Sequence, residues 1–454
     1  MPPVLVSRGG PAALNMDFTN ICGLASNFPS IQFHLSKAKP HFLFLTETQI
    51  SSDSGGGFYV PSYQLHSKFS FKGGCCAYVR SDVVCTRASH LESDEFSALW
   101  LRFAGEPIAK FICCLYMSPT VDSLAFYQYL LFSVDRILTL SPCSEIVILG
   151  DFNAHHSEWL SSPRTDQRGL LVFDLAEHFD LTQLVVGPTR YPDREGDSPN
   201  TLDLFLTSNP LPYTINLCPP LGTSDHVLVS VSSLSSNVQV ERPPQLERRR
   251  LWHYGGADWT TFRDHLSSFD WENDCFCDDD VSEVAVRVTK VILDAMWSYI
   301  PSSLQSLKPS KVWFDAECGR AIRRRDIAFR KFRRVMTSGA RSAYVRLRND
   351  AKRVLRNAKD SFIRERCRGL AGSSSSRAFW HLAKNIPTNF ASPSFPPLLS
   401  PDGSVAVLPS AKAELFAEFF ANNSNMDDAG AVPPSPPASE VMMPVVDISD
   451  AEVH

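Results

Sequence analysis

The stretch that decides the fold is residues 146–156, which read Ile-Val-Ile-Leu-Gly-Asp-Phe-Asn-Ala-His-His. Its first four residues are apolar and three of them are β-branched, which predicts a short buried strand that ends at Gly150. Asp151 and Asn153 follow at a spacing of two, and in an extended chain residues so spaced point to the same side. We therefore expect a carboxylate and an amide together at a strand end, where α/β sheets bind their ligands. Taken alone, the stretch is equally typical of a strand followed by a polar turn.

Polar side chains also fall at the ends of other predicted strands. Asn20 follows an alternating segment that predicts a half-buried strand. Glu47 comes directly after a buried strand, and Tyr116 ends another. Taken alone, Glu47 has an ordinary alternative as an exposed carboxylate at a strand end. Further strands are predicted at 58–65, 74–79, 98–103 and 181–186, and amphipathic helices at 123–140 and 168–179.

Asp203 lies among apolar neighbours in a strand predicted at 201–206. A buried carboxylate without a partner is costly, so we expect Asp203 to have one. His226 is the obvious candidate, in the group Ser224-Asp225-His226 that precedes an apolar run. A serine hydrolase is a second reading of that group, but no glycine pattern of a nucleophile elbow surrounds Ser224.

These residue types indicate a particular chemistry. Carboxylates and amides are hard oxygen ligands, which suit Mg²⁺ rather than zinc. A carboxylate–histidine pair can position an imidazole for acid/base work. Hydrolysis of a phosphodiester requires charge neutralisation, an activated water and help for the leaving oxygen, and this set can supply all three.

Charge is distributed unevenly along the chain of 454 residues. The net charge of the whole chain is −5. Residues 320–368 contain 18 Lys/Arg and 4 Asp/Glu, so this segment carries +14 and the rest carries −19. The segment is predicted to form one or two long helices with a narrow apolar stripe, and such a basic block is typical of nucleic-acid binding. Its alternative is a solvated, Arg-rich coiled segment. The candidate contacts are Arg323, Arg324, Arg325, Arg330, Lys331, Arg333 and Arg334.

Twelve cysteines are scattered without the spacing of a zinc site or a disulfide framework, which fits reduced thiols in an intracellular protein. Residues 1–10 lack the apolar core of a signal peptide. No apolar run of about 18 residues occurs, so no membrane span is expected.

The polar motifs occur in an order that resembles the endonuclease/exonuclease/phosphatase superfamily. The motifs are Asn20 with Gly23-Leu24, Thr46-Glu47-Thr48, Tyr116 before Ser-Pro, Gly150-Asp151-Phe152-Asn153, Leu202-Asp203 and Ser224-Asp225-His226. The resemblance implies an α/β fold, namely a four-layer α/β sandwich of two mixed β-sheets flanked by helices, followed here by a basic α-helical region. Gly-Asp-Phe-Asn-Ala-His-His-x-x-Trp, which ends at Trp159, resembles the apurinic-type endonuclease of jockey-like non-LTR (LINE-type) retrotransposons.

The resemblance also implies roles for the site residues. Glu47 is expected to be the principal Mg²⁺ ligand, with Asn20 and Asp225 nearby and Mn²⁺ able to substitute. Asp151 is expected to orient or deprotonate the attacking water, and Asn153 to hold Asp151 and the phosphate. His226, oriented by Asp203, is expected to contact the scissile phosphate, and Tyr116 to stabilise the transition state. Whether Asp151 or His226 is the general base stays open at this point. One departure is Val227-Leu228, where relatives often have a proline two residues past the histidine.

The downstream region resembles the linker that such elements carry before their reverse transcriptase. Residues 401–403 and 415–420 resemble the entry to the polymerase, and the chain is expected to be truncated before its catalytic core. Met426-Asp427-Asp428 mimics the Asp-Asp box of reverse transcriptases but lacks its surrounding strand hairpin pattern. The predicted organisation is a disordered N-terminus at 1–13, the endonuclease domain at 14–233, a linker at 234–250, a basic helical linker region at 251–390, and a partly disordered Pro/Ser-rich segment at 391–454.

The expected function is a Mg²⁺-dependent endonuclease that nicks target DNA and leaves a 3′-hydroxyl as a primer. The alternatives are an abasic-site endonuclease or phosphatase of the same fold, and an inactive fragment that only binds nucleic acid. The expected partners are the DNA target, element RNA and the reverse transcriptase domain of the polyprotein, with no membrane involved. The expected location is intracellular, and nuclear when the enzyme acts on chromosomal DNA. Removal of 311–454 is expected to leave the catalytic residues intact.

Overall fold

The computed structural model describes residues 13–51, 57–103, 108–157, 159–160, 162–192, 197–234, 250–277, 280–304, 313–371, 379–380, 382–383, 398–400, 405–406 and 409–424. Residues 1–12 of the predicted disordered N-terminus, residues 235–249 of the predicted linker, and the motifs at 401–403 and 426–428 fall outside these residues. The chain divides into two units, residues 1–397 and 398–454, and each is described by itself.

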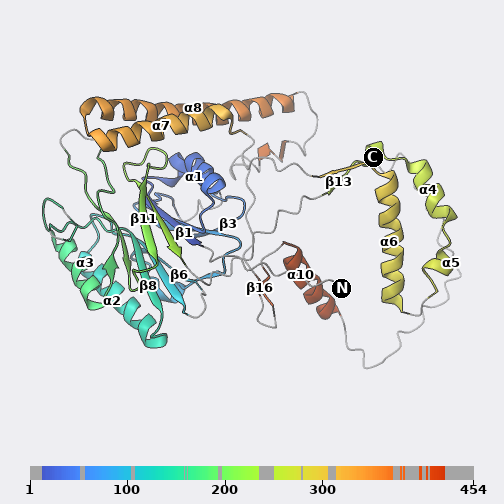
Figure 1. The fold of residues 1–454 in the computed structure, drawn as a ribbon, viewed down its shortest axis with the longest axis horizontal. Coiled ribbons are helices and arrows are strands. Elements are labelled where there is room, and N and C mark those ends of the chain that lie inside the picture. Colours follow the sequence, from blue (N-terminus) through green and yellow to red (C-terminus); the bar gives the residue numbers. More distant parts are fainter. Residues whose placement is uncertain are drawn as a thin grey trace. The chain divides into compact units, whose positions relative to one another are not determined.

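Residues 13–234 form two six-stranded mixed sheets that share a buried apolar layer (Figure 1). Each sheet has one parallel pair of neighbouring strands, β1 with β2 and β7 with β8, and its other pairs are antiparallel. The first sheet has the order β11 (Tyr213–Cys218), β12 (Leu228–Leu234), β1 (Ala13–Asn20), β2 (Phe42–Thr46), β4 (Cys75–Arg80) and β3 (Tyr63–Lys68). The second has the order β5 (Cys85–Arg87), β6 (Ser97–Phe103), β7 (Lys110–Tyr116), β8 (Glu145–Asp151), β10 (Asp203–Thr207) and β9 (Thr182–Gln183).

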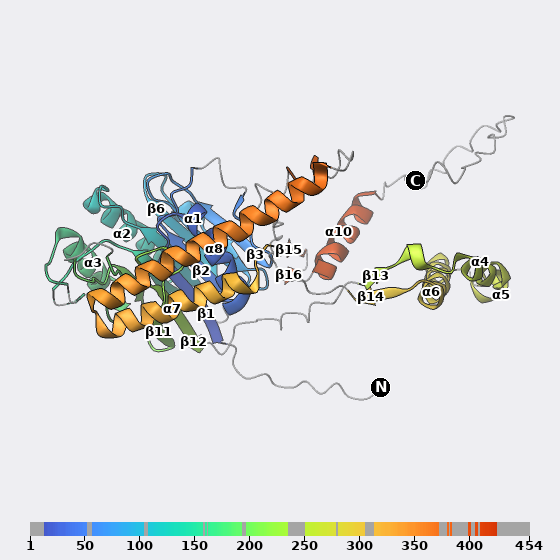
Figure 2. The ribbon, with the colours of Figure 1, turned by 90° about the horizontal axis from the view of Figure 1, so that it is seen from above.

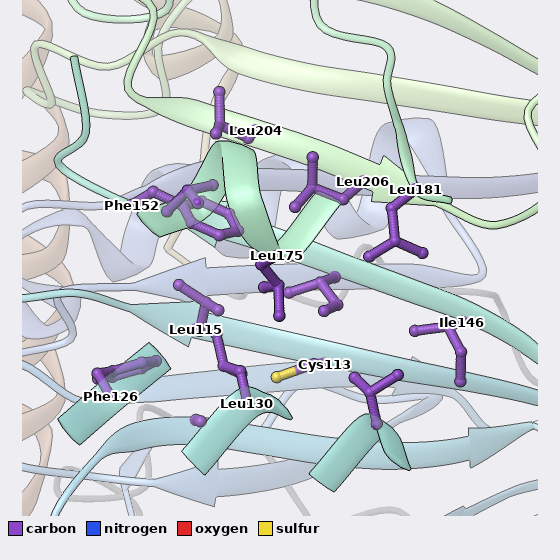
Figure 3. Close-up of a cluster of buried hydrophobic side chains, with 14 of the residues drawn as sticks. Cys113, Leu115, Phe126, Leu130, Ile146, Phe152, Leu175, Leu181, Leu204 and Leu206 are labelled. Carbon is purple, nitrogen blue, oxygen red and sulfur yellow. The ribbon is translucent and has the colours of Figure 1, made fainter. Parts of the chain in front are cut away.

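Helices cover the outer face of each sheet. Helix α1 (Leu24–Ala38) packs on the first sheet through Phe28, Ile31 and Leu35. Helices α2 (Ser123–Leu140) and α3 (Gln167–His178) pack on the second sheet in the cluster drawn in Figure 3, which includes Phe126 and Leu175. The predicted four-layer α/β sandwich of two mixed sheets is confirmed.

Local sequence accounts for most helix and strand boundaries and explains why one predicted strand, at 181–186, is short. Helix α2 has the predicted bounds, and the Asp122 carboxylate caps it by accepting from the backbone N–H groups of residues 124 and 125. The strand predicted at 58–65 lies at 63–68 instead. The strand predicted at 181–186 is reduced to two residues because the Gln183 side chain hydrogen-bonds both the N–H and the C=O of Val185. Such local side-chain bonds compete with strand pairing.

The residues after 250 form two helical groups and a small second unit. A short ribbon of β13 (Arg250–Trp252) and β14 (Ser302–Leu304) accompanies α4 (Trp259–Ser268), α5 (Trp271–Asp274) and α6 (Val281–Tyr299). Helices α7 (Ala316–Val335) and α8 (Ser338–Ala371) form a helical hairpin, side by side in Figure 2. The second unit contains β15 (Leu398–Leu399), β16 (Val405–Ala406) and α10 (Pro409–Ser424). In the described part of the chain, no helix has the combined length and hydropathy that a membrane span requires.

The α7–α8 hairpin, which lies in the basic helical linker region predicted at 251–390, packs against the two-sheet domain. One contact cluster joins Phe329, Phe332 and Tyr344 of the hairpin to Tyr191 and Val227 of the domain. A second cluster places Trp313, Phe314 and Ile322 against Phe33 of α1. The two clusters bury large apolar side chains, so removal of the hairpin would expose the domain surface beneath it.

Candidate active site

Strand register places three of the predicted site residues side by side. In the second sheet, Tyr116 of β7 and Asp203 of β10 are both the paired neighbours of Asp151 at the end of β8. In the first sheet, Asn20 ends β1 opposite the last residue of β2, and Glu47 follows β2 directly. The hydrogen bonds below show that these two groups of residues meet in one site.

Gly150 permits the close approach of β8 to β7. Its φ is +133°, and a Cβ atom at this position would lie 2.0 Å from the carbonyl oxygen of Leu115. A side chain is excluded by both the backbone conformation and the clash. The glycine that ends the predicted apolar run therefore fixes Asp151 beside Tyr116.

Asn20 joins the two sheets at the site. Its Nδ2 donates to Glu47 Oε2 at 2.7 Å and to Asp151 Oδ2 at 2.8 Å. Its Oδ1 accepts from the backbone N–H of Cys22 at 2.9 Å. We expected Asn20 to lie near Glu47, and the structure shows this contact. It also shows that Asn20 contacts Asp151.

Asn153 holds Asp151 from the other side. The backbone N–H of Asn153 donates to Asp151 Oδ1 at 3.0 Å, and its Nδ2 donates to the carbonyl of Met117 at 3.0 Å. Asn153 adopts a left-handed φ of 47°, a conformation that asparagine tolerates better than most residues. Residues 151–153 are therefore not the extended segment that the spacing assumed, and Asn153 contacts Asp151 at 3.0 Å through its backbone N–H and at 3.5 Å through its side chain.

Asp203 and His226 form the expected pair. His226 Nδ1 lies 2.7 Å from Asp203 Oδ2, and both side chains are buried. Thr189 Oγ1 accepts from the backbone N–H of Asp203, and Ser224 Oγ accepts from that of His226. Asp203 Oδ1 has no hydrogen-bond partner among the described residues, so this buried acceptor is available to a further donor or cation.

The pKa values of both Asp151 and His226 are raised above their ordinary values. Burial, together with the neighbouring charge of Asp203, raises the pKa of Asp151 to about 7. Burial lowers the pKa of His226, but the carboxylates of Asp203, Asp151 and Asp225 outweigh it and raise that pKa to about 9. At neutral pH His226 is therefore an imidazolium, whereas Asp151 is poised to exchange a proton.

Two residues near Asp225 were missed by the sequence analysis. Arg190 Nε donates to Asp225 Oδ2 at 2.8 Å, and Cys22 Sγ donates to Asp225 Oδ1 at 3.3 Å. The pKa of Asp225 is lowered because His226 and Arg190 outweigh its burial. Cys22 follows Asn20 at a spacing of two, the signal that linked Asp151 to Asn153. Arg190 lies in a segment without strand periodicity and had no such signal.

Tyr116 lies at the carboxylate side of the site. Burial, followed by the charges of Glu47 and Asp151, raises the pKa of its phenol. The Tyr116 hydroxyl thus keeps its proton at neutral pH and can donate a hydrogen bond to an anion.

The donor set fits a divalent cation. Glu47, Asp151 and Asp225 contribute carboxylate oxygens, and Asp203 Oδ1 is an unsatisfied acceptor. Burial is the main reason that the pKa values of Asp151 and Tyr116 are raised, and the neighbouring carboxylates raise them further, so negative charge gathers here. Two clusters, Cys22-Asp225-His226 and Asp151-Asp203-His226, place one ligand atom of each member within 4.8 Å of the others.

The predicted nucleic-acid contacts on α7 divide into two kinds. Arg323, Arg324, Arg330, Lys331, Arg333 and Arg334 are exposed. Arg325 is a correction, because it is only 4% exposed and donates from Nη1 to the carbonyl of Gly222 at 3.1 Å while pairing with Asp326. Its guanidinium is used within the protein and does not face a phosphate.

Comparisons with known proteins find one family model and several solved structures that are similar to parts of this chain. Residues 111–230 match the model of a family described as "Endonuclease-reverse transcriptase". The structure is similar to the endonuclease domain of TRAS1, a telomere-specific non-LTR retrotransposon, at 13% identity and a TM-score of 0.40, covering 48% of this chain and 97% of that one. It is similar to the AP endonuclease LMAP from Leishmania major at 14% identity and a TM-score of 0.41, covering 49% and 88%. It is also similar to the catalytic domain of APE2 from Xenopus laevis at 16% identity and a TM-score of 0.39, covering 49% and 93%. A comparison with curated proteins finds no match.

The family match lies within the domain whose strand ends carry the site, and it includes Tyr116, Asp151 and Asp203. The match spans 120 of the 454 residues, all of them within the two-sheet domain.

Proposed function

We propose that this domain is a Mg²⁺-dependent DNA endonuclease of a non-LTR retrotransposon. It nicks target DNA by hydrolysing a phosphodiester and leaves a 3′-hydroxyl that primes reverse transcription. The observation that carries the proposal is the hydrogen-bonded set around the buried Asp151, in which Asn20 links Glu47 to Asp151 across the two sheets. The description of the matched family, which names endonuclease and reverse transcriptase together, supports the retrotransposon origin.

Mg²⁺ would be held by Glu47 and Asp225, whose carboxylate oxygens are the ligands that Mg²⁺ prefers. Asn20 would orient Glu47 through its Nδ2, because its Oδ1 accepts from the backbone N–H of Cys22. When bound, the cation would neutralise charge on the phosphate and on the leaving oxygen. Mn²⁺ has similar ligand preferences and would substitute.

Asp151 is the proposed general base. Its carboxylate is fixed by the amide of Asn20 and the backbone N–H of Asn153, and its pKa of about 7 matches a base that works near neutral pH. His226 already carries its proton at that pH, so it is the proposed donor to a phosphate oxygen, oriented by Asp203. The phenol of Tyr116 is a second donor for the transition state. We therefore propose Asp151, rather than His226, as the base.

The exposed basic residues of the α7–α8 hairpin are the proposed contacts to DNA away from the site. Phosphate contacts of this kind give affinity without strong sequence preference. Element RNA and the reverse transcriptase domain are the other proposed partners of this region. Action on chromosomal DNA would take place in the nucleus.

Nicking of supercoiled plasmid by the full chain tests the proposal. We expect open-circular product with Mg²⁺ and none with excess chelator. A DNA polymerase should extend the nick without prior end treatment, because the product carries a 3′-hydroxyl. Cleavage of abasic plasmid alone would favour the repair endonuclease, and phosphate release from a 3′-phosphorylated end without nicking would favour the phosphatase. Binding without any cleavage would indicate an inactive fragment.

A further inference from the structure

Two segments that carry site residues meet as a short antiparallel ribbon, residues 189–191 and 225–227. Arg190 bridges to His226 across this ribbon. The backbone N–H of Tyr191 donates to the carbonyl of Asp225 at 2.8 Å, and that of Val227 donates to the carbonyl of Thr189 at 2.7 Å. The ribbon therefore sets the positions of Arg190, Asp225 and His226 relative to one another.

The α7–α8 hairpin packs on the apolar side chains of this ribbon. The Tyr191 ring meets Phe329 edge-on with ring centroids 5.6 Å apart, and Phe332 at 6.1 Å. Val227 is fully buried in the same cluster. Phe329 is 1% exposed and also contacts Tyr344 of α8 at 5.1 Å. Tyr191 directly follows Arg190 in the sequence, and Val227 directly follows His226. The hairpin therefore packs on the two residues that are next in sequence to residues of the site.

A buried charge ties the hairpin to the turn that leads into the ribbon. Arg325 Nη1 donates to the carbonyl of Gly222, three residues before Asp225. The same turn is held from α1, where Asn27 Oδ1 accepts from the backbone N–H of Thr223 at 2.8 Å. A guanidinium is costly to bury unless its donors are satisfied, so the Arg325 contact favours one position of the turn.

We propose that the α7–α8 hairpin is a working part of the nuclease, in which Phe329 and Arg325 are positioning residues. They act through the ribbon and the turn before it, and they keep Arg190, Asp225 and His226 in their observed geometry. The activity arm of the test rests on the proposed function, but the claim about the ribbon does not.

The first experiment measures backbone hydrogen exchange in the full chain, at the N–H groups of Tyr191 and Val227. Phe329→Ala should remove most of the protection of these two groups. The matched control is Ile322→Ala, which truncates another buried side chain of the same helix. Ile322 belongs to the other cluster, with Trp313 and Leu355. Ile322→Ala should leave both groups protected. Equal loss in the two variants would show a purely global effect and overturn the proposal, as would unchanged exchange in Phe329→Ala.

The second experiment compares nicking by the same variants at a temperature where all of them are folded. Phe329→Ala should lower kcat about 100-fold with little change in KM, because a small misplacement of catalytic groups is enough for such a loss. Phe329→Leu, which keeps an apolar side chain, should recover most of the rate, and Ile322→Ala should keep it. Full activity of Phe329→Ala would overturn the proposal. A wild-type chain that does not nick would defeat the proposed function alone, since the exchange measurement would still decide the role of the hairpin.

Discussion

The active site and the α7–α8 hairpin offer polar groups to the same expected partner, phosphate, but by opposite means. In the site, hydrogen bonds within the protein already hold most of the functional side chains in place. Asn20, for example, donates to both Glu47 and Asp151. On the hairpin, 14 of the 18 Lys/Arg residues between 320 and 368 are exposed. The first arrangement is fixed before the ligand arrives, whereas the second consists of separate side chains on long, flexible stems.

The difference predicts how each region responds to change. A preorganised site loses most of its function when one member is removed, because the others lose their alignment. Exposed charges act additively and are screened by salt. The following tests separate these two behaviours, from the largest expected effect to the smallest.

Glu47→Ala should reduce the nicking rate about 1,000-fold or more at ordinary Mg²⁺, since it removes the principal proposed ligand and several kcal/mol of charge stabilisation. Initial rates of plasmid nicking across a Mg²⁺ titration would measure the loss. Glu95→Ala, a change at an exposed carboxylate of the same domain, serves as the control and should retain the wild-type rate. Activity of Glu47→Ala that persists in excess chelator would contradict the metal assignment.

Asp203→Asn should lower the rate about 100-fold or more, because the His226 imidazole loses the carboxylate that orients it and holds its proton. His226→Ala should cause a similar loss, and the double variant should add little to either. Single-turnover rates of the three variants give the comparison, with thermal melts to confirm folding. Losses that multiply would mean that the two residues act independently.

On the hairpin, the full chain should bind duplex DNA with a slope of log K against log salt near −5, if about six phosphates are neutralised at about −0.9 each. Replacing Arg330, Lys331 and Arg334 by glutamine should flatten that slope by up to about 2.7. The same charge change at the exposed residues Lys37, Arg102 and Arg263 is the control and should leave the slope unchanged. Equal slopes for both triple variants would assign the hairpin charges to another partner.

The smallest effect concerns stability, at a buried imidazole away from the proposed ligands. His41 Nδ1 accepts from the backbone N–H of Asn15 at 3.0 Å, and burial, aided by Arg80, lowers the pKa of His41 to about 4. The unfolded chain takes up the proton near pH 6.5, so stability should fall as pH drops from 6.5 to 4 and level off below that. The loss should be about 3 kcal/mol, at about 1.4 kcal/mol for each unit by which the pKa is lowered.

Urea titrations at pH 7 and pH 4.5 would measure this difference. His41→Asn has no group that titrates in this range, so its pH dependence should be smaller than that of the wild type. An identical pH dependence would exclude His41 as its source.

The individual strands and the polar residues at their ends were predicted from local patterns, whereas the sandwich of two sheets was predicted from the resemblance of the ordered motifs to a known superfamily. Alternation and apolar runs mark strands, and a spacing of two linked Asp151 to Asn153. The ribbon that carries Arg190 was not predictable, because its bonds join segments 35 residues apart through isolated bridges. The docking of the hairpin was missed for a related reason. The apolar stripe of α8 was visible in the sequence, but nothing in the pattern of Phe329 or Tyr191 indicates that they pack together.

The contact between Phe329 and the ribbon has a consequence for the order of events at the ribosome. Strand β12 ends at Leu234, and Phe329 is added about 95 residues later. At synthesis rates of about 5–20 residues per second, this interval lasts roughly 5–20 s. During that time all strands of the domain have been synthesised, but Phe329, which packs in one cluster with Tyr191 and Val227, has not. If the hairpin has the role proposed above, the ribbon reaches its final geometry only after translation has passed through α7 and α8.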